Sequence, residues 1–310
     1  MTRTIALLLA ASAALSAPAL AQQTSAQPES GEQPSILDRL LDRVLGPAQQ
    51  AEETAAESEG SSLIEIILAE DYRAEDRARD RYRHPEETLA FFRVEPTMTV
   101  AEIGPGGGWY SRILAPLTAY QGRYLVVNSG TGGRGLDAEQ IARANAATAG
   151  FPARVEEWTG VTADRVTAFN SDEIPEGLAG TVDRILVFRA MHGLLNNGIA
   201  DTEIRQWREL LAEGGMIGVV QHRAPESEVW ERANGSRGYL KQSDVIALFD
   251  AHGFELVGSS EINANPGDPA NWERGVWTLP PTLAGGEENR SQYLAIGESD
   301  RMTLLFRKAD

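Results

Sequence analysis

A glycine-rich segment, AEIGPGGGWYS at residues 101–111, has the composition best suited to holding a ligand. Four of its eleven residues are glycines; an apolar run precedes them and an amphipathic segment follows. This pattern predicts a strand, a glycine turn and a helix, which together place backbone N–H groups and the positive helix end at the ligand-binding edge of a sheet. We therefore expect a ligand to lie directly against the backbone of this turn.

The spacing of the glycines disfavours two ligand classes. A dinucleotide-binding turn has the pattern G-x-G-x-x-G, and counting from Gly104 puts Trp109 where the third glycine belongs. A phosphate-binding loop needs a Lys-Ser or Lys-Thr pair after the glycines, and none follows. The remaining pattern is an acidic residue followed by alternate glycines: Glu102, Gly104, Gly106 and Gly108. The alternative is a tight turn that needs glycine for its own backbone and holds no ligand.

The segments that would position this turn alternate between strand-like and helix-like patterns. The predicted strands are residues 97–103, 123–127, 165–169, 182–188, 216–220, 254–259 and 301–308, and the predicted helices are 109–117, 137–150, 201–215 and 243–253. The helix at 137–150 has a capping box of Asp137 and Gln140 and a stop at Gly150. Apolar runs without strict alternation indicate a mostly parallel sheet covered on both faces. The predicted fold is therefore a doubly wound α/β domain at 97–310, with an insertion at 263–300.

Several segments together resemble a known family. They are the acidic-x-G-x-G-x-G turn, LAEGG before the fifth strand, RARDRYRHPEETLAFFRVEP, EIGPGGGWYSRILAP, FRAMHG, VVQHRAP and AIGESDRMTLLFRK. The chain resembles the class I S-adenosylmethionine-dependent methyltransferases, in particular a bacterial family of predicted methyltransferases that often carry signal peptides. The resemblance covers about residues 65–310. It implies a Rossmann-like sheet with an antiparallel C-terminal strand, and S-adenosyl-L-methionine as the cofactor.

The resemblance also implies cofactor contacts. Glu102 would attract the methionyl ammonium group of S-adenosylmethionine while the glycine backbone lies against the ligand, and Tyr110 would line the pocket beside a packed Trp109. Asn128 stands where the family usually has a carboxylate for the ribose hydroxyls, and an amide lacks the charge-assisted strength of that carboxylate. After the third strand, Asn170 and Asp172 stand where an adenine contact is expected; an ordinary polar turn is the alternative.

Methyl transfer needs positioning more than covalent help, and a general base only if the acceptor is protonated. Three of the four histidines, His84, His192 and His222, are expected near the ligand edge of the sheet. We expect His192 to be the catalytic or substrate-orienting residue, because it follows the fourth strand, where this fold commonly presents groups to the acceptor. A histidine held by structural hydrogen bonds is the alternative. Arg189 and His222 are candidate contacts for an anionic acceptor, or pair with buried acidic residues.

Composition excludes other function classes. The chain has 28 Lys and Arg against 45 Asp and Glu, a formal charge of −17, so nucleic acid and anionic membranes are disfavoured as partners. It has no cysteine, which excludes disulfides and thiolate zinc sites. No pair of histidine and carboxylate residues has the spacing of a helical zinc site, so we expect no metal.

The N-terminal region predicts export. Residues 1–21 combine Arg3, an apolar run and the small-residue site Ala19-Leu20-Ala21, which is typical of a signal peptide cleaved after Ala21. Residues 22–60 have the composition of a mostly disordered leader, interrupted by an amphipathic helix at 35–46. A helical extension at 61–96 is expected to begin near Ser62 and to break at His84-Pro85.

The sequence thus predicts a periplasmic or secreted methyltransferase acting on a small-molecule acceptor, with no nucleic-acid partner and no membrane association after cleavage. Its oligomeric state is not specified by any pattern. The alternative is an exported binding protein that keeps the fold without turnover. Asn128 and the signal peptide favour the alternative, because no supply of S-adenosylmethionine outside the cytoplasm follows from the sequence. The number of matching motifs favours the enzyme.

Overall fold

The structure is a computed structural model that describes residues 62–309 of the 310-residue chain. The signal peptide predicted at 1–21 and the helix predicted at 35–46 lie outside the described residues. Within the described part, no helix is long and apolar enough to cross a membrane.

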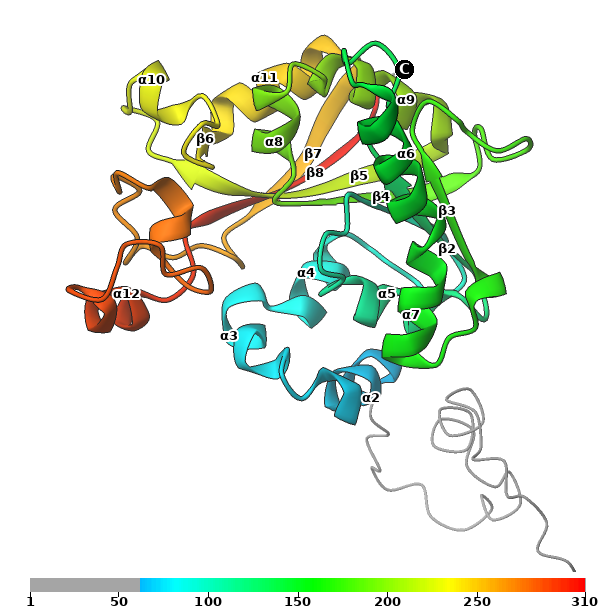
Figure 1. Ribbon diagram of the computed structural model, residues 1–310, viewed down its shortest axis with the longest axis horizontal. Coiled ribbons are helices and arrows are strands. Elements are labelled where there is room, and N and C mark those ends of the chain that lie inside the picture. The colour runs from blue at the N-terminus through cyan, green and yellow to red at the C-terminus, as the bar shows by residue number, and fades with distance from the viewer. Residues whose placement is uncertain (1–61, 310) are drawn as a thin grey trace, which may run out of the picture. The chain divides into compact units, whose positions relative to one another are not determined.

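A single mixed sheet organises the described residues (Figure 1). Its strands are β1 (Thr99–Ile103), β2 (Arg123–Asn128), β3 (Val166–Asn170), β4 (Val182–Phe188), β5 (Leu211–Ala224), β6 (Leu240–Lys241), β7 (Phe254–Ser260) and β8 (Arg301–Lys308). The order across the sheet is β3-β2-β1-β4-β5-β8-β7, with β6 paired to the end of β5. Strands β1 to β5 are parallel, while β8 runs antiparallel to both of its neighbours, β5 and β7.

Helices cover both faces of the sheet. The α-helices are α2 (Leu63–Ala69), α3 (Asp80–Arg83), α4 (Pro85–Phe91), α5 (Ser111–Thr118), α6 (Ala138–Ala149), α7 (Phe151–Thr159), α8 (Met191–Asn196), α9 (Ala200–Leu210), α10 (Trp230–Ala233), α11 (Gln242–Ala251) and α12 (Arg290–Ile296). Short 3-10 helices are η1 (Asp71–Arg73), η2 (Arg77–Arg79), η3 (Ala163–Arg165) and η4 (Gly275–Thr278). One apolar core lies between the sheet and α9 and α11, and the other lies between the sheet and α2, α4, α5 and α7.

The apolar strands follow from this two-sided burial. Along β1, Ala101 and Ile103 belong to the core on the α9 side, while Val100 belongs to the core on the α5 side. Successive side chains of a strand point to opposite faces, so a strand with helices on both sides must be apolar at nearly every position. Glu102 is a polar exception: it is buried and lies between the apolar residues Ala101 and Ile103.

The predicted strands and fold class are confirmed. Every predicted strand is present within a few residues of its expected bounds, and the antiparallel C-terminal strand is β8. The fold is a Rossmann-like, doubly wound α/β fold with a mostly parallel sheet. The capping box of α6 is also confirmed: Asp137 accepts from the Gln140 N–H at 2.8 Å, and the Gln140 side chain accepts from the Asp137 N–H.

Two helix predictions are wrong in extent. The helix predicted at 201–215 ends at Leu210, because Leu211 already pairs with Val182 and the segment to Gly215 forms the irregular start of β5. The helix predicted from Ser62 begins there with a capping box, but Glu70 is extended and the chain continues as short helical pieces. The expected break at His84 is confirmed, since its φ is +40° and α4 starts at Pro85.

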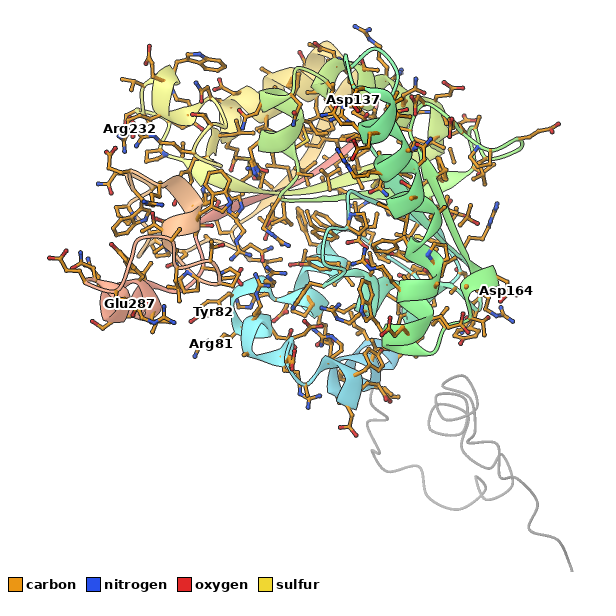
Figure 2. All side chains as sticks on the ribbon, viewed as in Figure 1. Arg81, Tyr82, Asp137, Asp164, Arg232 and Glu287 are labelled. Carbon is orange, nitrogen blue, oxygen red and sulfur yellow. The ribbon has the colours of Figure 1, made fainter. Side chains whose placement is uncertain are left out.

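The segment at 263–300 connects β7 to β8 and contains η4 and α12. Residues of this segment, including Val276 and Trp272, form a small separate cluster with Tyr239 and Ala233. It also meets the N-terminal helices: a Cβ added at Gly297 would lie 2.4 Å from the ring of Tyr82 on α3, which Figure 2 labels. The two segments therefore touch across the carboxyl edge of the sheet, where β8 begins.

Candidate functional site

The glycine turn follows β1 and faces open space. Gly104, Gly106 and Gly108 have φ of +53°, +58° and +74°, values that favour glycine over any other residue. A Cβ added at Gly104, Gly106 or Gly107 would meet no atom within 4 Å, whereas one at Gly108 would lie 2.2 Å from Trp158. Gly107 is the informative position, because neither a left-handed backbone nor internal packing requires glycine there. Among the described residues, the space where a Cβ would lie is thus open at Gly104, Gly106 and Gly107, while the Gly107 carbonyl accepts a hydrogen bond from Arg112 Nη1 at 3.0 Å.

Glu102 stands behind this turn in a fixed position. Its Oε2 accepts hydrogen bonds from Ser111 Oγ at 2.7 Å and Tyr124 OH at 2.6 Å, while Oε1 makes none with the described residues. Only 2% of the side chain is exposed. Burial raises the pKa of Glu102, and the two hydroxyls and the charge of Arg189 act in the opposite direction. One carboxyl oxygen is therefore anchored and the other remains for a ligand.

Trp109 and Tyr110 are both buried, which differs from the expectation that Tyr110 lines an open pocket. Tyr110 is 2% exposed; its ring stacks on Phe188 with centroids 3.4 Å apart, and its hydroxyl donates to the Arg83 carbonyl at 3.3 Å. Trp109 lies against the guanidinium groups of Arg73 and Arg83, at 5.2 and 4.5 Å. These two rings fasten the N-terminal helices to the glycine turn and to the end of β4.

Asn128 and Asn170, at the ends of β2 and β3, are joined through helix α6. Asn128 Nδ2 donates to Thr148 Oγ1 at 2.9 Å, and Thr148 Oγ1 donates to Asn170 Oδ1 at 2.7 Å. Asn170 Nδ2 in turn donates to Asn145 Oδ1 at 2.7 Å. Asn170 thus has both polar ends bonded within the protein, whereas Asn128 Oδ1 makes no hydrogen bond with the described residues and can accept one from a hydroxyl.

Asp172 holds the loop that follows β2. Its Oδ2 accepts from the backbone N–H groups of Thr131 and Gly132 at 2.9 and 2.7 Å. Gly130 allows this approach, because a Cβ there would lie 2.7 Å from Asp172 Cγ. Between Asn170 and Asp172, Ser171 ties the same loop to Glu203 of α9. The structure therefore gives Asp172 a loop-holding role, and its expected adenine contact stays a prediction.

His192 and His222 come together from the ends of β4 and β5. Their ring centroids are 5.7 Å apart, and the Trp277 ring lies 6.0 Å from His192. His222 Nδ1 lies 2.6 Å from Ser299 Oγ, while His192 Nδ1 has a longer contact, 3.4 Å, with the Gln221 amide. Burial lowers the pKa of both histidines, and the charge of Arg301 lowers that of His222 further. Both imidazoles are therefore neutral at pH 7 and able to accept a proton.

The other two histidines lie elsewhere. His84 forms the left-handed break between α3 and α4. His252 lies at the end of α11, and its Nε2 is 3.0 Å from Asp201 Oδ1. Neither contacts His192 or His222 among the described interactions.

A cavity of about 270 Å³ opens beside these rings. The N-terminal helices contribute Arg79 and Arg83, the end of β4 contributes Arg189, β5 contributes His222, and the 263–300 segment contributes Trp277 and Glu298. Arg189 has a φ of +57°, a strained conformation for a non-glycine residue, and its N–H donates to the Val220 carbonyl.

Glu298 is the centre of the charged groups around this cavity. It accepts from Arg79 Nε at 2.6 Å, Arg83 Nε at 3.2 Å and Arg301 Nη2 at 2.7 Å. Burial alone would raise the pKa of Glu298, but the surrounding guanidinium groups outweigh it and hold the pKa at about 2. Burial lowers the pKa of Arg189 to about 10, and the nearby charge of Arg301 acts in the same direction.

The structure brings together some expected site residues and adds others. Arg189 and His222 line one cavity, and the His192 ring lies beside it, 5.7 Å from that of His222, while Glu102 and Asn128 lie at the ends of β1 and β2. Sequence reasoning missed Arg301, Glu298 and Thr148 as participants. The signal for the first two was a charged pair three residues apart, with Glu298 just before β8 and Arg301 at its first position. Among residues 62–309, no group of three or more His, Asp or Glu side chains could hold a metal ion.

Comparison with known proteins gives fold likeness only. No family model matches the chain, and no curated protein matches it. An S-adenosylmethionine-dependent methyltransferase from Aquifex aeolicus has 16% identity and a TM-score of 0.43, covering 64% of this chain and 93% of its own.

Two solved methyltransferases with bound S-adenosylhomocysteine are also similar. The 1,6-didemethyltoxoflavin-N1-methyltransferase of Burkholderia thailandensis has 12% identity and a TM-score of 0.43, covering 82% of this chain and 94% of its own. The N-methyltransferase NodS of Bradyrhizobium japonicum has 16% identity and a TM-score of 0.43, covering 80% and 97%. Because the identities are below 25% and the TM-scores below 0.5, no residue role is transferred from these proteins.

Proposed function

We propose that this protein is an exported S-adenosylmethionine-dependent methyltransferase that acts on a small-molecule acceptor. The observation that carries the proposal is the glycine turn after β1, where Gly107 is required neither by its backbone conformation nor by packing. Backbone kept bare at the carboxyl edge of a doubly wound sheet is what a ligand lying against it requires. The pattern Glu102-x-Gly104-x-Gly106-x-Gly108 favours an adenosyl sulfonium over a dinucleotide.

The chemistry of the surrounding groups fits this ligand. Glu102 Oε1 makes no hydrogen bond with the described residues, and a carboxylate at this position complements an ammonium group. Asn128 Oδ1 is available to accept from a ribose hydroxyl, because its amide nitrogen is already bonded to Thr148. Both groups stand at the carboxyl ends of adjacent strands, β1 and β2, on either side of the turn. Bound S-adenosylmethionine supplies a methyl group on a positively charged sulfur, which is transferred in line to a nucleophile.

The residues of the cavity prepare the acceptor. His192 and His222 are neutral at pH 7, so each has an unprotonated ring nitrogen for the proton that a hydroxyl or amine acceptor loses as it is methylated. Burial and the nearby arginines oppose protonation of His222 strongly, since they hold its pKa well below 6.5. His192 is the stronger candidate for this base, since its Nδ1 has only the 3.4 Å contact with Gln221, whereas His222 Nδ1 is held by Ser299. Trp277, Pro280 and Pro281 add apolar surface to the lining of the cavity.

The test is a matched pair of glycine substitutions. Gly107→Ala adds a methyl group to the bare turn, and Gly258→Ala adds one on β7, where the new Cβ makes only an ordinary contact of 3.6 Å with Phe91. Neither position has a left-handed backbone, so both variants keep or slightly raise the free energy of unfolding. Calorimetric titration is expected to show S-adenosylhomocysteine bound by the unmodified chain and by Gly258→Ala, and bound about tenfold more weakly by Gly107→Ala.

Two outcomes contradict the proposal. The absence of binding heat from S-adenosylhomocysteine with the unmodified chain contradicts it directly. Equal affinity in both glycine variants means that the turn serves only the backbone. NAD is the negative control ligand, because the dinucleotide pattern fails at Trp109.

A second candidate is an exported binding protein that retains the site without turnover. Asn128 favours it, since the amide lacks the charge that strengthens a ribose contact. Incubation with S-adenosylmethionine and pools of small phenols, amines and carboxylic acids distinguishes the two. Formation of S-adenosylhomocysteine favours the enzyme, and binding without formation favours the second candidate.

A further inference from the structure

The cavity beside His222 carries unbalanced positive charge. Arg79, Arg83 and Arg189 line it together with Glu298, and Arg301 is bonded to that carboxylate, which pairs with Arg79, Arg83 and Arg301. Glu102 interacts electrostatically with Arg189, so we also count it as a negative charge. The four arginines then face two carboxylates, which leaves an excess of two positive charges. Both histidines are neutral at pH 7 and add nothing.

Part of this charge is buried without a partner. Arg83 and Arg301 are 2% and 1% exposed, and each has a buried Nη1 that makes no hydrogen bond with the described residues. Arg189 Nη1 is buried and unbonded in the same way. Removing a cationic donor from water without a compensating acceptor is costly, so a cluster of such donors indicates an anion that completes it.

We propose that this cavity binds the carboxylate of the methyl acceptor, and that the acceptor is a small aromatic carboxylic acid. This inference rests on the function proposed above. The planar guanidinium fork of arginine matches a carboxylate with two parallel hydrogen bonds. The lining also includes apolar side chains, namely Val276, Trp277, Pro280 and Pro281, and Trp277 is 39% exposed.

The size of the cavity agrees with this assignment. Its volume of about 270 Å³ exceeds the roughly 150 Å³ that encloses a benzene ring, leaving room for a carboxylate and one further substituent. The ring of Trp277, which lies 6.0 Å from that of His192 and is partly exposed, offers a face for stacking on an aromatic acceptor. A substituent on that ring would then approach His192.

The acceptor is favoured over the carboxylate of S-adenosylmethionine as the source of the anion. No residue of the glycine turn lines the cavity; its walls come from the ends of β4 and β5, the N-terminal helices and the 263–300 segment. Arg189 and His192, the candidate base, lie three residues apart after β4, so anion and proton acceptor are presented from one segment. The experiment separates the two sources.

Arg189 offers a clean variant. Its φ of +57° is a conformation that asparagine tolerates better than arginine, and its side chain has no hydrogen-bond partner among the described residues, so Arg189→Asn removes the charge without loss of folding. Arg93→Asn is the matched control. Arg93 has a φ of +54°, is exposed, and lies between α4 and β1 at the opposite edge of the sheet.

The probes are benzoate, its neutral isostere benzamide and inorganic phosphate, titrated against Trp fluorescence and ligand NMR signals. The expected result is that benzoate binds, that benzamide and phosphate bind at least about tenfold more weakly, and that Arg189→Asn weakens benzoate about tenfold while Arg93→Asn leaves it unchanged. Unchanged benzoate affinity in Arg189→Asn overturns the proposal, as does tighter binding of phosphate than of benzoate.

A second titration separates acceptor from donor. S-adenosylhomocysteine carries the amino-acid carboxylate, and 5′-methylthioadenosine lacks it. The proposal expects Arg189→Asn to change the affinity of both by less than about twofold. A loss confined to S-adenosylhomocysteine overturns it, because the arginines would then hold the donor. Benzoate binding without any S-adenosylhomocysteine binding contradicts the proposed function but leaves the anion site in place, so the two failures are distinguishable.

Discussion

At the scale of single residues, the cavity shows how surroundings set protonation. Glu298 is buried, which opposes ionisation, yet three guanidinium groups hold its pKa at about 2. Burial also disfavours the charged forms of His192 and His222, which lowers the pKa of both imidazoles. The nearby arginines lower these pKa values further. An ionised acid, Glu298, and a neutral base, His222, therefore line one cavity at pH 7, with the neutral ring of His192 beside them.

The histidines give a prediction on pH. The imidazole C–H signals of His192 and His222, assigned with His192→Gln and His222→Gln, are expected to titrate with midpoints below the ordinary histidine value of 6.5. Because the unfolded chain takes up these protons more readily, the free energy of unfolding declines as pH falls below 6.5 and is unaffected by these residues above it. Once an acceptor is identified, kcat/KM should stay level at neutral pH and fall only below 6.5.

The measurement is a proton NMR titration on the purified chain, so it needs no substrate. A midpoint above 6.5 for His192 would contradict the prediction and remove it as a base that is neutral at pH 7. If kcat/KM keeps the same dependence on pH in His192→Gln, another group takes the proton.

At the scale of elements, the sheet could be predicted from sequence and the charged cavity could not. Apolar runs, a glycine turn and the caps at Asp137 and Ser62 are local signals, and the structure confirms them. The cavity depends on contacts across the fold: Arg79 and Glu298 are separated by 219 residues in the chain. Nothing local in the N-terminal arginines distinguishes such contacts from a solvated helix face, because both produce the same charge pattern.

The broken N-terminal helices show the same limit. Their sequence suits one long helix up to His84, but the chain is extended at Glu70 and continues as short turns. Arg73 is fully buried and bonded to Asp80, and Arg83 lies over Trp109. Tertiary contacts of buried arginines thus override the local helix propensity, and they do so where the cavity is built.

Helix α6 connects the ends of β2 and β3 through Thr148, whose hydroxyl is hydrogen-bonded to both Asn128 and Asn170. Thr148→Val keeps the shape but leaves Asn128 Nδ2 and Asn170 Oδ1 without their Thr148 partner, and is expected to lower the free energy of unfolding by about 1–3 kcal/mol. S-adenosylhomocysteine affinity should fall as well, because Asn128 loses its fixed orientation.

Thr118→Val is the matched control for α6. Thr118 is a fully buried helix residue whose hydroxyl donates only to the Leu114 carbonyl within its own helix. Thr118→Val is therefore expected to lower the free energy of unfolding by less than Thr148→Val and to leave ligand affinity unchanged. Denaturant unfolding and calorimetry measure the two quantities. Equal effects of both variants would mean that the Asn128–Thr148–Asn170 connection does not matter to the site.

At the scale of the whole molecule, an acidic chain encloses a basic cavity. The formal charge is −17, while the groups around Glu298 have a net positive charge. Exposed charges farther away than about 8 Å are largely screened at physiological salt, whereas buried charges are screened much less. An anion that reaches the cavity is therefore governed by the arginines there, and the acidic surface mainly disfavours large polyanions such as nucleic acid.

Export is the whole-molecule prediction, and it also bears on which of the two proposed functions applies. Residues 1–21, which lie outside the described part of the structure, have Arg3 as their charged residue; cleavage after Ala21 therefore changes the formal charge from −17 to −18. Expressed in a Gram-negative host, the chain is expected in the periplasmic fraction with Gln22 as its first residue, as measured by intact mass. Leu8→Arg interrupts the apolar run and should retain the uncleaved chain in the cytoplasm, whereas Leu8→Val should not.

An uncleaved chain in the membrane fraction would contradict cleavage. A cleaved periplasmic chain that purifies without a bound nucleoside would have to meet its methyl donor after export, which favours the binding protein unless turnover is observed with added S-adenosylmethionine.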